Sequence, residues 1–226
     1  MCGRFTSSVR REALAERFQI ALPETVSERY NVAPGQRVLA LRRGEDRESE
    51  ATLLRWGLIP HWAKDAGIAY RTINARAETL LEKSSYRALV GSRRCLIVAD
   101  GFYEWRVGSD GRKQPIRFSR VDEDAFGFAG LWTTWADRQS GELVESCTII
   151  TTTPNELVAP VHDRMPVILP PELEQSWLDP EVEAQEALSF LQPYPAVLMK
   201  ALAASPLVNN VRNDFRDLLK ADALAA

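Results

Sequence analysis

The stretch Cys95-Leu96-Ile97-Val98-Ala99-Asp100-Gly101 combines the two signals that decide the fold of this chain. Its first five residues are apolar and include β-branched side chains, which is typical of a short buried strand. The pair Asp100-Gly101 is a turn signal that ends this strand. The aromatic run Phe102-Tyr103-Glu104-Trp105 follows at once. We therefore expect a chain built from short strands joined by turns.

The same pattern of short strands recurs on both sides of this stretch. Before it, strands are expected at 37–42 and 51–56, joined by a charged hairpin. After it, strands are expected at 115–119, 125–133, 145–151 and 167–168, with hairpin turns at Gly111 and Gly141. Helices are expected at 10–18, 78–90, 171–178 and 181–191, and a loop with a turn at Pro34-Gly35 is expected at 30–36. Because strands and helices do not alternate as βαβ units, the pattern indicates an α+β fold with mainly antiparallel sheet flanked by helices.

Size and composition limit the class of protein. The chain has 226 residues, of which 45% are hydrophobic, enough to bury a core without disulfides or metals. No repeat, low-complexity tract or linker divides it, so we expect a single domain over residues 1–226. No apolar stretch approaches the ~18 to 20 residues that span a bilayer, and no signal peptide is recognisable, so a cytoplasmic location without membrane contact is expected. The net charge of −3 gives no overall signature of nucleic-acid binding.

The cysteines and the missing motifs exclude several classes of site. Cys2, Cys95 and Cys147 are odd in number and widely spaced, which argues against a disulfide framework and against a zinc site. We therefore expect no metal and no cofactor. The chain also lacks the G-x-S-x-G elbow of serine hydrolases and the G-x-x-x-x-G-K-[ST] loop that binds phosphates.

The start of the chain, Met1-Cys2-Gly3-Arg4, suggests an unusual nucleophile. Initiator methionine is generally removed before a small residue, so we expect Cys2 to become the N-terminal residue with both a free amine and a thiol. The α-amine has a reference pKa of about 7.7 to 8.0 and the thiol about 8.5, so both are partly nucleophilic at neutral pH. Such a pair condenses with an aldehyde to an imine and then closes to a thiazolidine. The alternative is that a cysteine stands at position 2 by accident.

Three further polar clusters interrupt apolar stretches. Asn74 and Arg76 are two residues apart and project from the same side of an extended segment, where Arg offers a planar fork suited to phosphate. Glu104 lies between aromatic residues, and a partly apolar wall raises the pKa of a carboxyl and makes it a candidate proton carrier. His162, beside Asp163 and ahead of a predicted strand, is a candidate acid or base.

Each of these residues also fits a structural role. Glu104 fits an edge strand with its carboxylate in water, His162 fits a hydrogen-bonded structural histidine, and Asn31 fits a turn cap. His61 and Trp62, in the aromatic loop that starts at Trp56, fit ordinary loop packing. Taken singly, these residues therefore leave the function open.

Taken together, six motifs resemble the SRAP (SOS response-associated peptidase) family in order and spacing. They are Met1-Cys2-Gly3-Arg4-Phe5, Tyr30-Asn31-Val32-Ala33-Pro34-Gly35, Trp56-Gly57-Leu58-Ile59-Pro60, Asn74-Ala75-Arg76-Ala77-Glu78, Ala99-Asp100-Gly101-Phe102-Tyr103-Glu104-Trp105 and Val161-His162-Asp163-Arg164-Met165-Pro166. The resemblance runs from Cys2 to about Asn213. It implies a partly barrel-like sheet, and a monomer that recognises abasic sites in single-stranded DNA, also at junctions with double-stranded DNA, and links itself covalently to them.

The resemblance also implies roles for individual residues. Cys2 would attack the ring-opened sugar aldehyde, Glu104 would move protons beside the Cys2 amine, and His162 would assist ring opening and reversal. Asn74 would position the sugar and the chain terminus. The residues implied in DNA binding are Arg4, Arg76, Trp62 and Asn31. Some family members carry two adjacent tryptophans where this chain has Trp62-Ala63.

Two other functions stay open at this point. One is a thiol peptidase or autopeptidase in which Cys2 pairs with His162, and the other is a non-covalent binding module for single-stranded DNA. The first would be a hydrolase, whereas aldehyde capture is closer to lyase chemistry in DNA repair. Replacing Cys2 by Ala separates covalent capture from simple binding.

Overall fold

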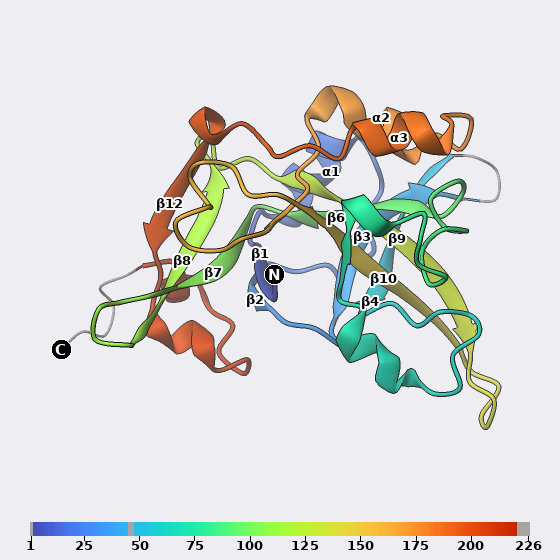
Figure 1. Ribbon diagram of the computed structural model, residues 1–226, viewed down its shortest axis with the longest axis horizontal. Helices are drawn as coiled ribbons and strands as arrows, with labels where there is room; N and C mark the ends of the chain where they lie inside the picture. Colours follow the sequence, from blue (N-terminus) through green and yellow to red (C-terminus); the bar gives the residue numbers. More distant parts are fainter. Residues whose placement is uncertain (1, 45–47, 221–226) are drawn as a thin grey trace.

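The computed structural model describes residues 2–44 and 48–220, and its centre is a closed five-stranded barrel (Figure 1). The barrel strands, in order around it, are β10 (Leu143–Thr152), β4 (Ser49–Trp56), β3 (Arg37–Arg43), β6 (Arg94–Ala99) and β9 (Phe126–Ala136). Strand β9 pairs back onto β10 and closes the ring. All neighbours are antiparallel except β4 and β10, which run parallel. The expected mainly antiparallel, partly barrel-like sheet is therefore confirmed.

A second, open sheet stands beside the barrel. Its order is β12 (Met199–Ala203), β8 (Lys113–Arg120), β7 (Gly101–Val107), β1 (Arg4–Ser7) and β2 (Arg29–Val32), all antiparallel. Two short strands, β5 (Asn74–Arg76) and β11 (Met165–Pro166), pair with the C-terminal half of β10. That half of β10 thus leaves the barrel and carries two further segments.

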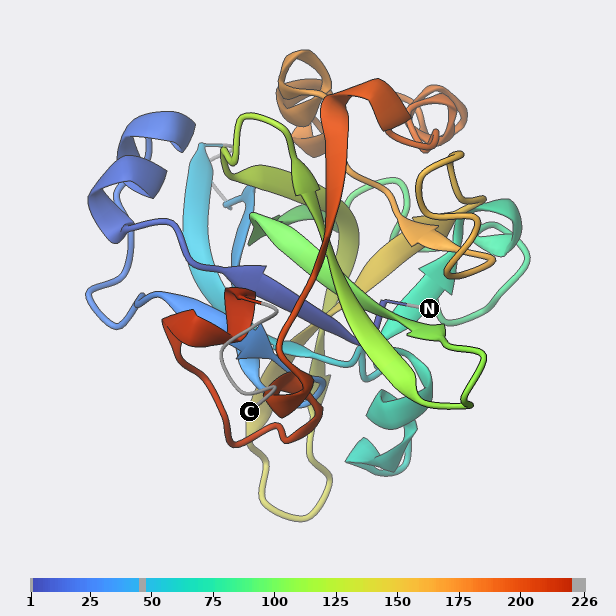
Figure 2. The same ribbon diagram turned by 90° about the vertical axis from the view of Figure 1, so that its left-hand side faces the viewer.

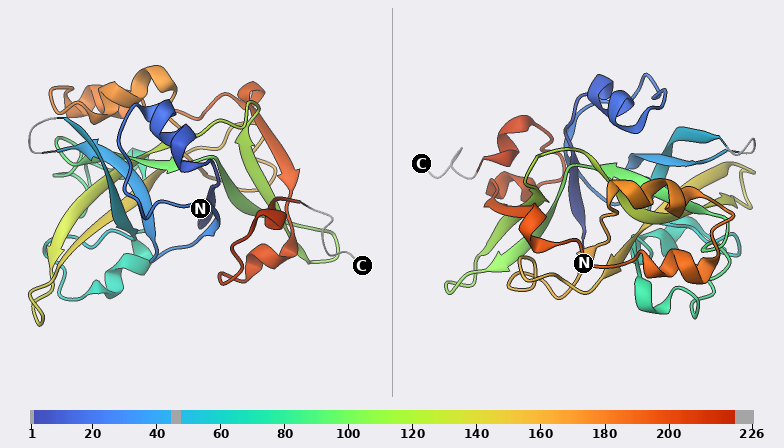
Figure 3. Two further views of the ribbon diagram at one scale, coloured as in Figure 1. Left: turned by 180° about the vertical axis from the view of Figure 1, so that it is seen from behind. Right: turned by 90° about the horizontal axis from the view of Figure 1, so that it is seen from above.

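Helices cover the outside of the sheets. They are α1 (Arg11–Phe18), α2 (Pro171–Leu178) and α3 (Ala184–Ser189), with the 3-10 turns η1 (Ala66–Arg71), η2 (Ala77–Thr79), η3 (Ala196–Leu198), η4 (Pro206–Asn209) and η5 (Arg216–Leu219). The view from above in Figure 3 shows α2 and α3 together on the barrel side of the molecule. The guanidinium of Arg94 donates to the carbonyl oxygens of Trp177 and Val182 and so holds α2 and its following turn against β6. Within the described residues, no helix is both long and apolar enough to cross a membrane.

An aromatic cluster fills the space between the two sheets. The ring of Phe5 on β1 contacts Trp56 at the end of β4 edge-on, with ring centres 5.1 Å apart. Phe102 on β7 stacks on Phe118 at 5.2 Å and meets Phe128 of the barrel edge-on. Such pairs contribute about 0.5–1.5 kcal/mol each beyond the area that they bury. The two sheets therefore share one core.

Most predicted elements are confirmed, and the exceptions have local causes. The segment 78–90 forms successive turns and no regular helix, because Ser84 and Ser85 in its middle favour turn conformations. The loop predicted at 30–36 begins as strand β2, whereas its turn is confirmed by Gly35 at a φ of 87°. The last helix is shorter than predicted, and the short final strand pairs two residues earlier, at Met165–Pro166. The tip of the charged hairpin, residues 45–47, lies outside the described residues.

Candidate active site

The four predicted catalytic residues come together where the open sheet meets the barrel. Cys2 precedes β1, Glu104 lies on β7, Asn74 lies on β5 and His162 lies in the loop between β10 and β11. Figure 2 shows the start of the chain beside β5, with the loop 153–164 above it and the β7–β8 hairpin in front. Three segments distant in sequence thus surround Cys2.

Strand registers bring these segments together. Strand β1 pairs with β7 through Arg4 and Tyr103, so the chain just before β1 runs beside Glu104. Strand β10 pairs with β5 through Ile149 and Asn74. Alternation along β5 turns Asn74 and Arg76 to the same side. Asn74 is buried whereas Arg76 is exposed, so the strand leads from the interior to the surface.

Asn74 connects the barrel to the start of the chain. Its Nδ2 donates to the carbonyl oxygen of Cys2 at 2.8 Å. Its Oδ1 is buried and has no hydrogen-bond partner among the described residues. Because a buried amide oxygen without a partner costs free energy, this atom is suited to accept a hydrogen bond from a group that enters the site. Tyr86 supports the strand from behind, since its hydroxyl donates to the carbonyl of Asn74 at 3.5 Å.

Glu104 is a buried carboxyl whose pKa lies near neutral pH. Its side chain is 5% exposed, and burial raises its pKa to about 7. The negative charge of Asp163 acts in the same direction. A carboxyl with this pKa is present in both protonation states near pH 7, so it can accept and return a proton.

His162 faces Glu104 across the site. Its Nε2 lies 4.0 Å from Oε2 of Glu104, and its Nδ1 accepts from the backbone N–H of Arg164 at 3.0 Å. Burial lowers the pKa of His162, and the exposed carboxylate of Asp163 opposes this shift. Nδ1 also lies 2.9 Å from Oδ1 of Asp163, and Nε2 is the ring nitrogen on the side of Glu104. The pair can therefore hold and exchange protons at neutral pH.

The thiol of Cys2 is neutral in this setting. Cys2 is fully buried, and its Sγ lies 3.7 Å from the carbonyl oxygen of Arg4. Burial raises the pKa of the thiol above its usual range, and the negative charge of Glu104 adds to the shift. An activated thiolate requires the opposite, a lowered pKa. The environment of Cys2 therefore does not favour a thiolate before the reaction. It is better suited to a thiol that loses its proton during the reaction.

Arg4 and Asn31 have structural contacts that the sequence did not predict. Nη1 of Arg4 donates to Oδ1 of Asn31 and to the carbonyl oxygen of Val208, each at 2.7 Å. Asn31 is completely buried, and its Nδ2 lies 2.7 Å from the carbonyl oxygen of Asn213. Asn31 has no exposed surface and joins these segments, and its predicted contact with DNA stays a prediction. The phosphate contact of half-buried Arg4 stays a prediction.

The other two predicted DNA-binding residues lie at the surface. Arg76 is exposed on β5 and Trp62 is 44% exposed in the segment between β4 and β5. Their contacts with DNA stay predictions. One residue that the sequence analysis left without a role is Arg164, which donates to both carboxylate oxygens of Glu78 and to the carbonyl oxygen of Thr151. It ties the loop of His162 to the end of β5, and its position within the His162 motif was the only sequence signal.

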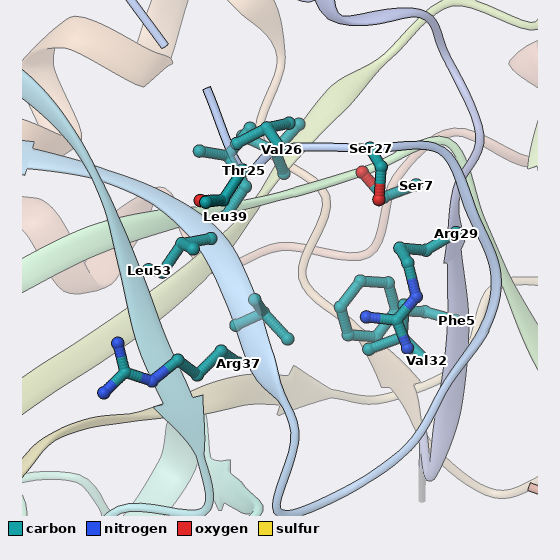
Figure 4. Close-up of a pocket in the computed structure, with 12 residues that line it drawn as sticks. Phe5, Ser7, Thr25, Val26, Ser27, Arg29, Val32, Arg37, Leu39 and Leu53 are labelled. Carbon is teal, nitrogen blue, oxygen red and sulfur yellow. The ribbon is translucent and has the colours of Figure 1, made fainter. Parts of the chain in front are cut away.

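In the part of the chain that the structure describes, neither a metal-binding group nor the cavity between β1 and the barrel coincides with this cluster. The described residues contain no group of three or more His, Cys, Asp or Glu side chains placed to hold a metal ion. A cavity of about 200 Å³ lies between β1, β2 and the barrel strands β3 and β4 (Figure 4). It is lined mainly by apolar side chains such as Phe5, Val32 and Leu39, and none of the four candidate residues lines it. It therefore belongs to a different part of the molecule.

Comparisons with known proteins match nearly the whole chain. The family model described as SOS response associated peptidase (SRAP) matches residues 1–211. The abasic site processing protein YoqW of Bacillus subtilis (strain 168) is 46% identical over 224 residues, which cover 97% of this chain and 99% of that protein. The abasic site processing protein HMCES of Gallus gallus is 36% identical, covering 77% of this chain and 59% of that protein. A crystal structure of a protein from Bacteroides thetaiotaomicron matches with a TM-score of 0.88 at 29% identity, covering 97% of this chain and 99% of that one.

Proposed function

Because this chain belongs to the SOS response associated peptidase (SRAP) family, we propose that it processes abasic sites in DNA, the activity named for its curated relatives. We propose further that it acts as a monomer on single-stranded DNA, including junctions with double-stranded DNA, and captures the lesion covalently through Cys2. The observation that carries this proposal is the convergence of Cys2, Asn74, Glu104 and His162 from four segments.

The proposed reaction uses both nucleophiles of an N-terminal cysteine. Removal of Met1 frees the nitrogen of Cys2 as an amine. This nitrogen attacks the aldehyde carbon of the ring-opened abasic sugar, and loss of one water gives an imine. The sulfur of Cys2 then adds to the same carbon, and the thiol proton passes to the imine nitrogen. The product is a thiazolidine, formed with no change in oxidation state.

Ring closure explains why amine and thiol belong to one residue. An imine at an abasic site acidifies the neighbouring carbon, and elimination of the phosphate there cuts the strand. Addition of sulfur removes the imine and so protects the strand. A lysine, which has no thiol, stops at the imine.

The residues around Cys2 fit the proton transfers of this reaction. His162, whose Nε2 lies on the side of Glu104, would donate a proton from Nε2 to the sugar oxygen during ring opening. Glu104, with a pKa raised by burial to about 7, would take a proton from the amine and help water to leave. Asn74 would hold Cys2 through its carbonyl and offer its unpartnered Oδ1 to the sugar. Arg76 and Arg4 would bind phosphates, and Trp62 would contact a base.

Two alternative functions make different demands on the site. A thiol peptidase needs a thiolate at neutral pH, whereas burial and Glu104 raise the pKa of the Cys2 thiol. A protein that only binds single-stranded DNA needs no buried cysteine beside a carboxyl whose pKa is about 7. The observed environment of Cys2 therefore favours capture of an aldehyde over both alternatives.

The test is a denaturing gel of the protein mixed with an oligonucleotide that carries one abasic site. We expect a band that survives denaturation with the wild type and disappears with Cys2→Ala and with an undamaged oligonucleotide. Cys2→Ser keeps the amine and should give slower, less stable capture. Cys2→Ala also keeps the terminal amine and can form at most an imine, so a band as stable as that of the wild type from this variant would contradict the role of the Cys2 thiol. Retained affinity without any covalent band would favour the binding module, and cleavage of a peptide substrate that depends on Cys2 would favour the peptidase.

A further inference from the structure

A second cavity lies at the end of β1 that is remote from Cys2. It has a volume of about 410 Å³ and is here called the outer cavity; its lining includes Ser8, Asp100 and the arginines Arg10, Arg117 and Arg216. In Figure 2, β1 runs from the start of the chain toward α1, and η5 lies beside that far end. The six residues from Cys2 to Ser8 span at most about 20 Å of extended chain. None of the four candidate catalytic residues lines the outer cavity.

Arg117, on β8, is buried in the wall of the outer cavity in a fixed orientation. Its Nε donates to the hydroxyl of Thr6 at 3.2 Å, and its Nη2 donates to Oδ1 of Asp100 at 3.1 Å. Gly101 leaves room for this guanidinium, because a Cβ there would lie 2.6 Å from Nε of Arg117. No described residue accepts a hydrogen bond from Nη1, the third nitrogen. Since Arg117 lines the cavity, Nη1 is available to a ligand there.

The carboxylates around the outer cavity already have donors, whereas two of its cations have no partner. The carboxylate pairs are Asp100 with Arg117 and the hydroxyl of Ser8, Glu28 with the hydroxyl of Tyr30, and Glu123 with Lys200. Arg10 and Arg216 are exposed, and neither guanidinium forms an ion pair with any residue that the structure describes. The side chains left without a partner are therefore cationic donors, which suits the cavity to an anion.

The start of α1 adds to this preference. The helix begins at Arg11, directly after the cavity residue Arg10, and no side chain caps its N-terminus. The first backbone N–H groups of a helix lack partners within the helix and carry a partial positive charge. Such an end is a ready site for a phosphate. At the outer cavity it stands beside a buried guanidinium that has a free donor.

We propose that the outer cavity binds a phosphate group, held by Nη1 of Arg117 and by the guanidinium groups of Arg10 and Arg216. A phosphate monoester offers three terminal oxygens and close to two negative charges, whereas a carboxylate offers two oxygens and one charge. Three guanidinium groups therefore match the phosphate better. The volume of about 410 Å³ also leaves room for the group that carries the phosphate. The site needs neither Cys2 nor an aldehyde, so it goes beyond the proposed function.

The test is a calorimetric titration of the full chain at low ionic strength with inorganic phosphate and with thymidine 5′-monophosphate. Both should bind, and thymidine, which lacks the phosphate, should not. We expect Arg10→Ala and Arg216→Ala each to weaken binding about fivefold, through the loss of one exposed charge-assisted contact. Arg212→Ala is the matched control, because it removes an exposed arginine of the same C-terminal segment that does not line the cavity. It should bind as the wild type does.

A third variant tests the buried donor. Arg117→Lys keeps the charge, but an ammonium has no planar fork and cannot hold Asp100 and a ligand in the same way. We expect it to weaken binding at least about tenfold. Urea unfolding shows whether this variant is folded, and the two exposed variants decide the question if it is not. No binding of either phosphate compound by the wild type, equal binding of thymidine, or an equal loss with Arg212→Ala would overturn the proposal.

The choice of probe identifies the source of the phosphate. Equal affinities for inorganic phosphate and thymidine monophosphate would assign recognition to the phosphate alone, and tighter binding of the nucleotide would assign a nucleotide site. An undamaged oligonucleotide with a 5′-phosphate that binds more tightly than its 5′-hydroxyl form, by a margin lost in Arg216→Ala, would identify the end of a DNA strand. Each of these results supports the phosphate site. Because no probe carries an aldehyde, failure of covalent capture by Cys2 would leave this result unaffected.

Discussion

The side-chain amide of Asn74 donates to the carbonyl oxygen of Cys2 at 2.8 Å, and this bond joins the two sheets at the candidate site. Asn74 belongs to β5, which is paired with barrel strand β10, whereas Cys2 leads into β1 of the open sheet. The position of Cys2, the candidate nucleophile, therefore depends on a strand of the other sheet.

Loss of this bond should slow capture more than it weakens binding. We expect Asn74→Ala to reduce the single-turnover rate of crosslinking by about three- to tenfold, the effect of one hydrogen bond of ~0.5–1.5 kcal/mol. Affinity for an oligonucleotide with tetrahydrofuran in place of the abasic sugar, which has no aldehyde and cannot be crosslinked, should change less than twofold. An equal loss of rate and affinity would show that Asn74 mainly binds DNA.

Glu104 should make the folded protein less stable as the pH rises. Below about pH 4.5 its carboxyl is protonated in both the folded and the unfolded chain. Between there and about pH 7 the unfolded chain releases the proton while the folded chain keeps it, so the free energy of unfolding falls. Glu104→Gln cannot titrate, and relative to the wild type it should gain about 2 kcal/mol between pH 5 and pH 8. Urea unfolding at both pH values measures this, and an identical pH dependence in the two proteins would contradict the raised pKa.

His162 should act in chemistry and not in binding. We expect His162→Ala to slow crosslinking by on the order of 10²-fold, the lower end of the effect of a general acid, with partial rescue by added imidazole. Asp163→Asn is the control, because Asp163 raises the pKa of His162 from an exposed position. This variant should remain active and shift the pH profile of the rate to lower pH. A fully active His162→Ala would assign ring opening to another group.

Asn31 should contribute to stability. It is fully buried, accepts from Arg4 and donates to the carbonyl oxygens of residues 208, 210 and 213, so Asn31→Ala removes one acceptor of the guanidinium and the donor to these carbonyl groups. We expect a loss of about 2 kcal/mol in the free energy of unfolding. If the variant instead unfolds as the wild type does but binds DNA weakly, the DNA contact predicted from the sequence is correct.

The elements that sequence predicted well are those with a local signal. The barrel strands β3, β4, β6 and β10 carry apolar runs bounded by turn residues, and α2 starts at a proline, so each is visible within a few residues. The short strands β1, β2, β5 and β12 have three to five residues each and form because of their partners. The residues of these short strands do not by themselves predict the strand pairing that forms the candidate site.

Individual site residues were likewise predictable only where the signal lies in neighbouring sequence. Glu104 and His162 were candidates because aromatic residues flank the first in sequence and Asp163 follows the second. The role of Asn31 depends on carbonyl groups of residues 208 and 213, about 180 positions later.

The most direct test of covalent capture is the intact mass of the product together with a count of its free thiols. The chain has three cysteines, so after denaturation a thiol-alkylating reagent should add three groups to the free protein. We predict a product with the mass of the chain without Met1 plus the DNA less one water, which takes up only two groups because the sulfur of Cys2 is in the ring. A product that takes up three groups would be an imine, and no covalent product from a chain shown to begin at Cys2 would contradict the mechanism.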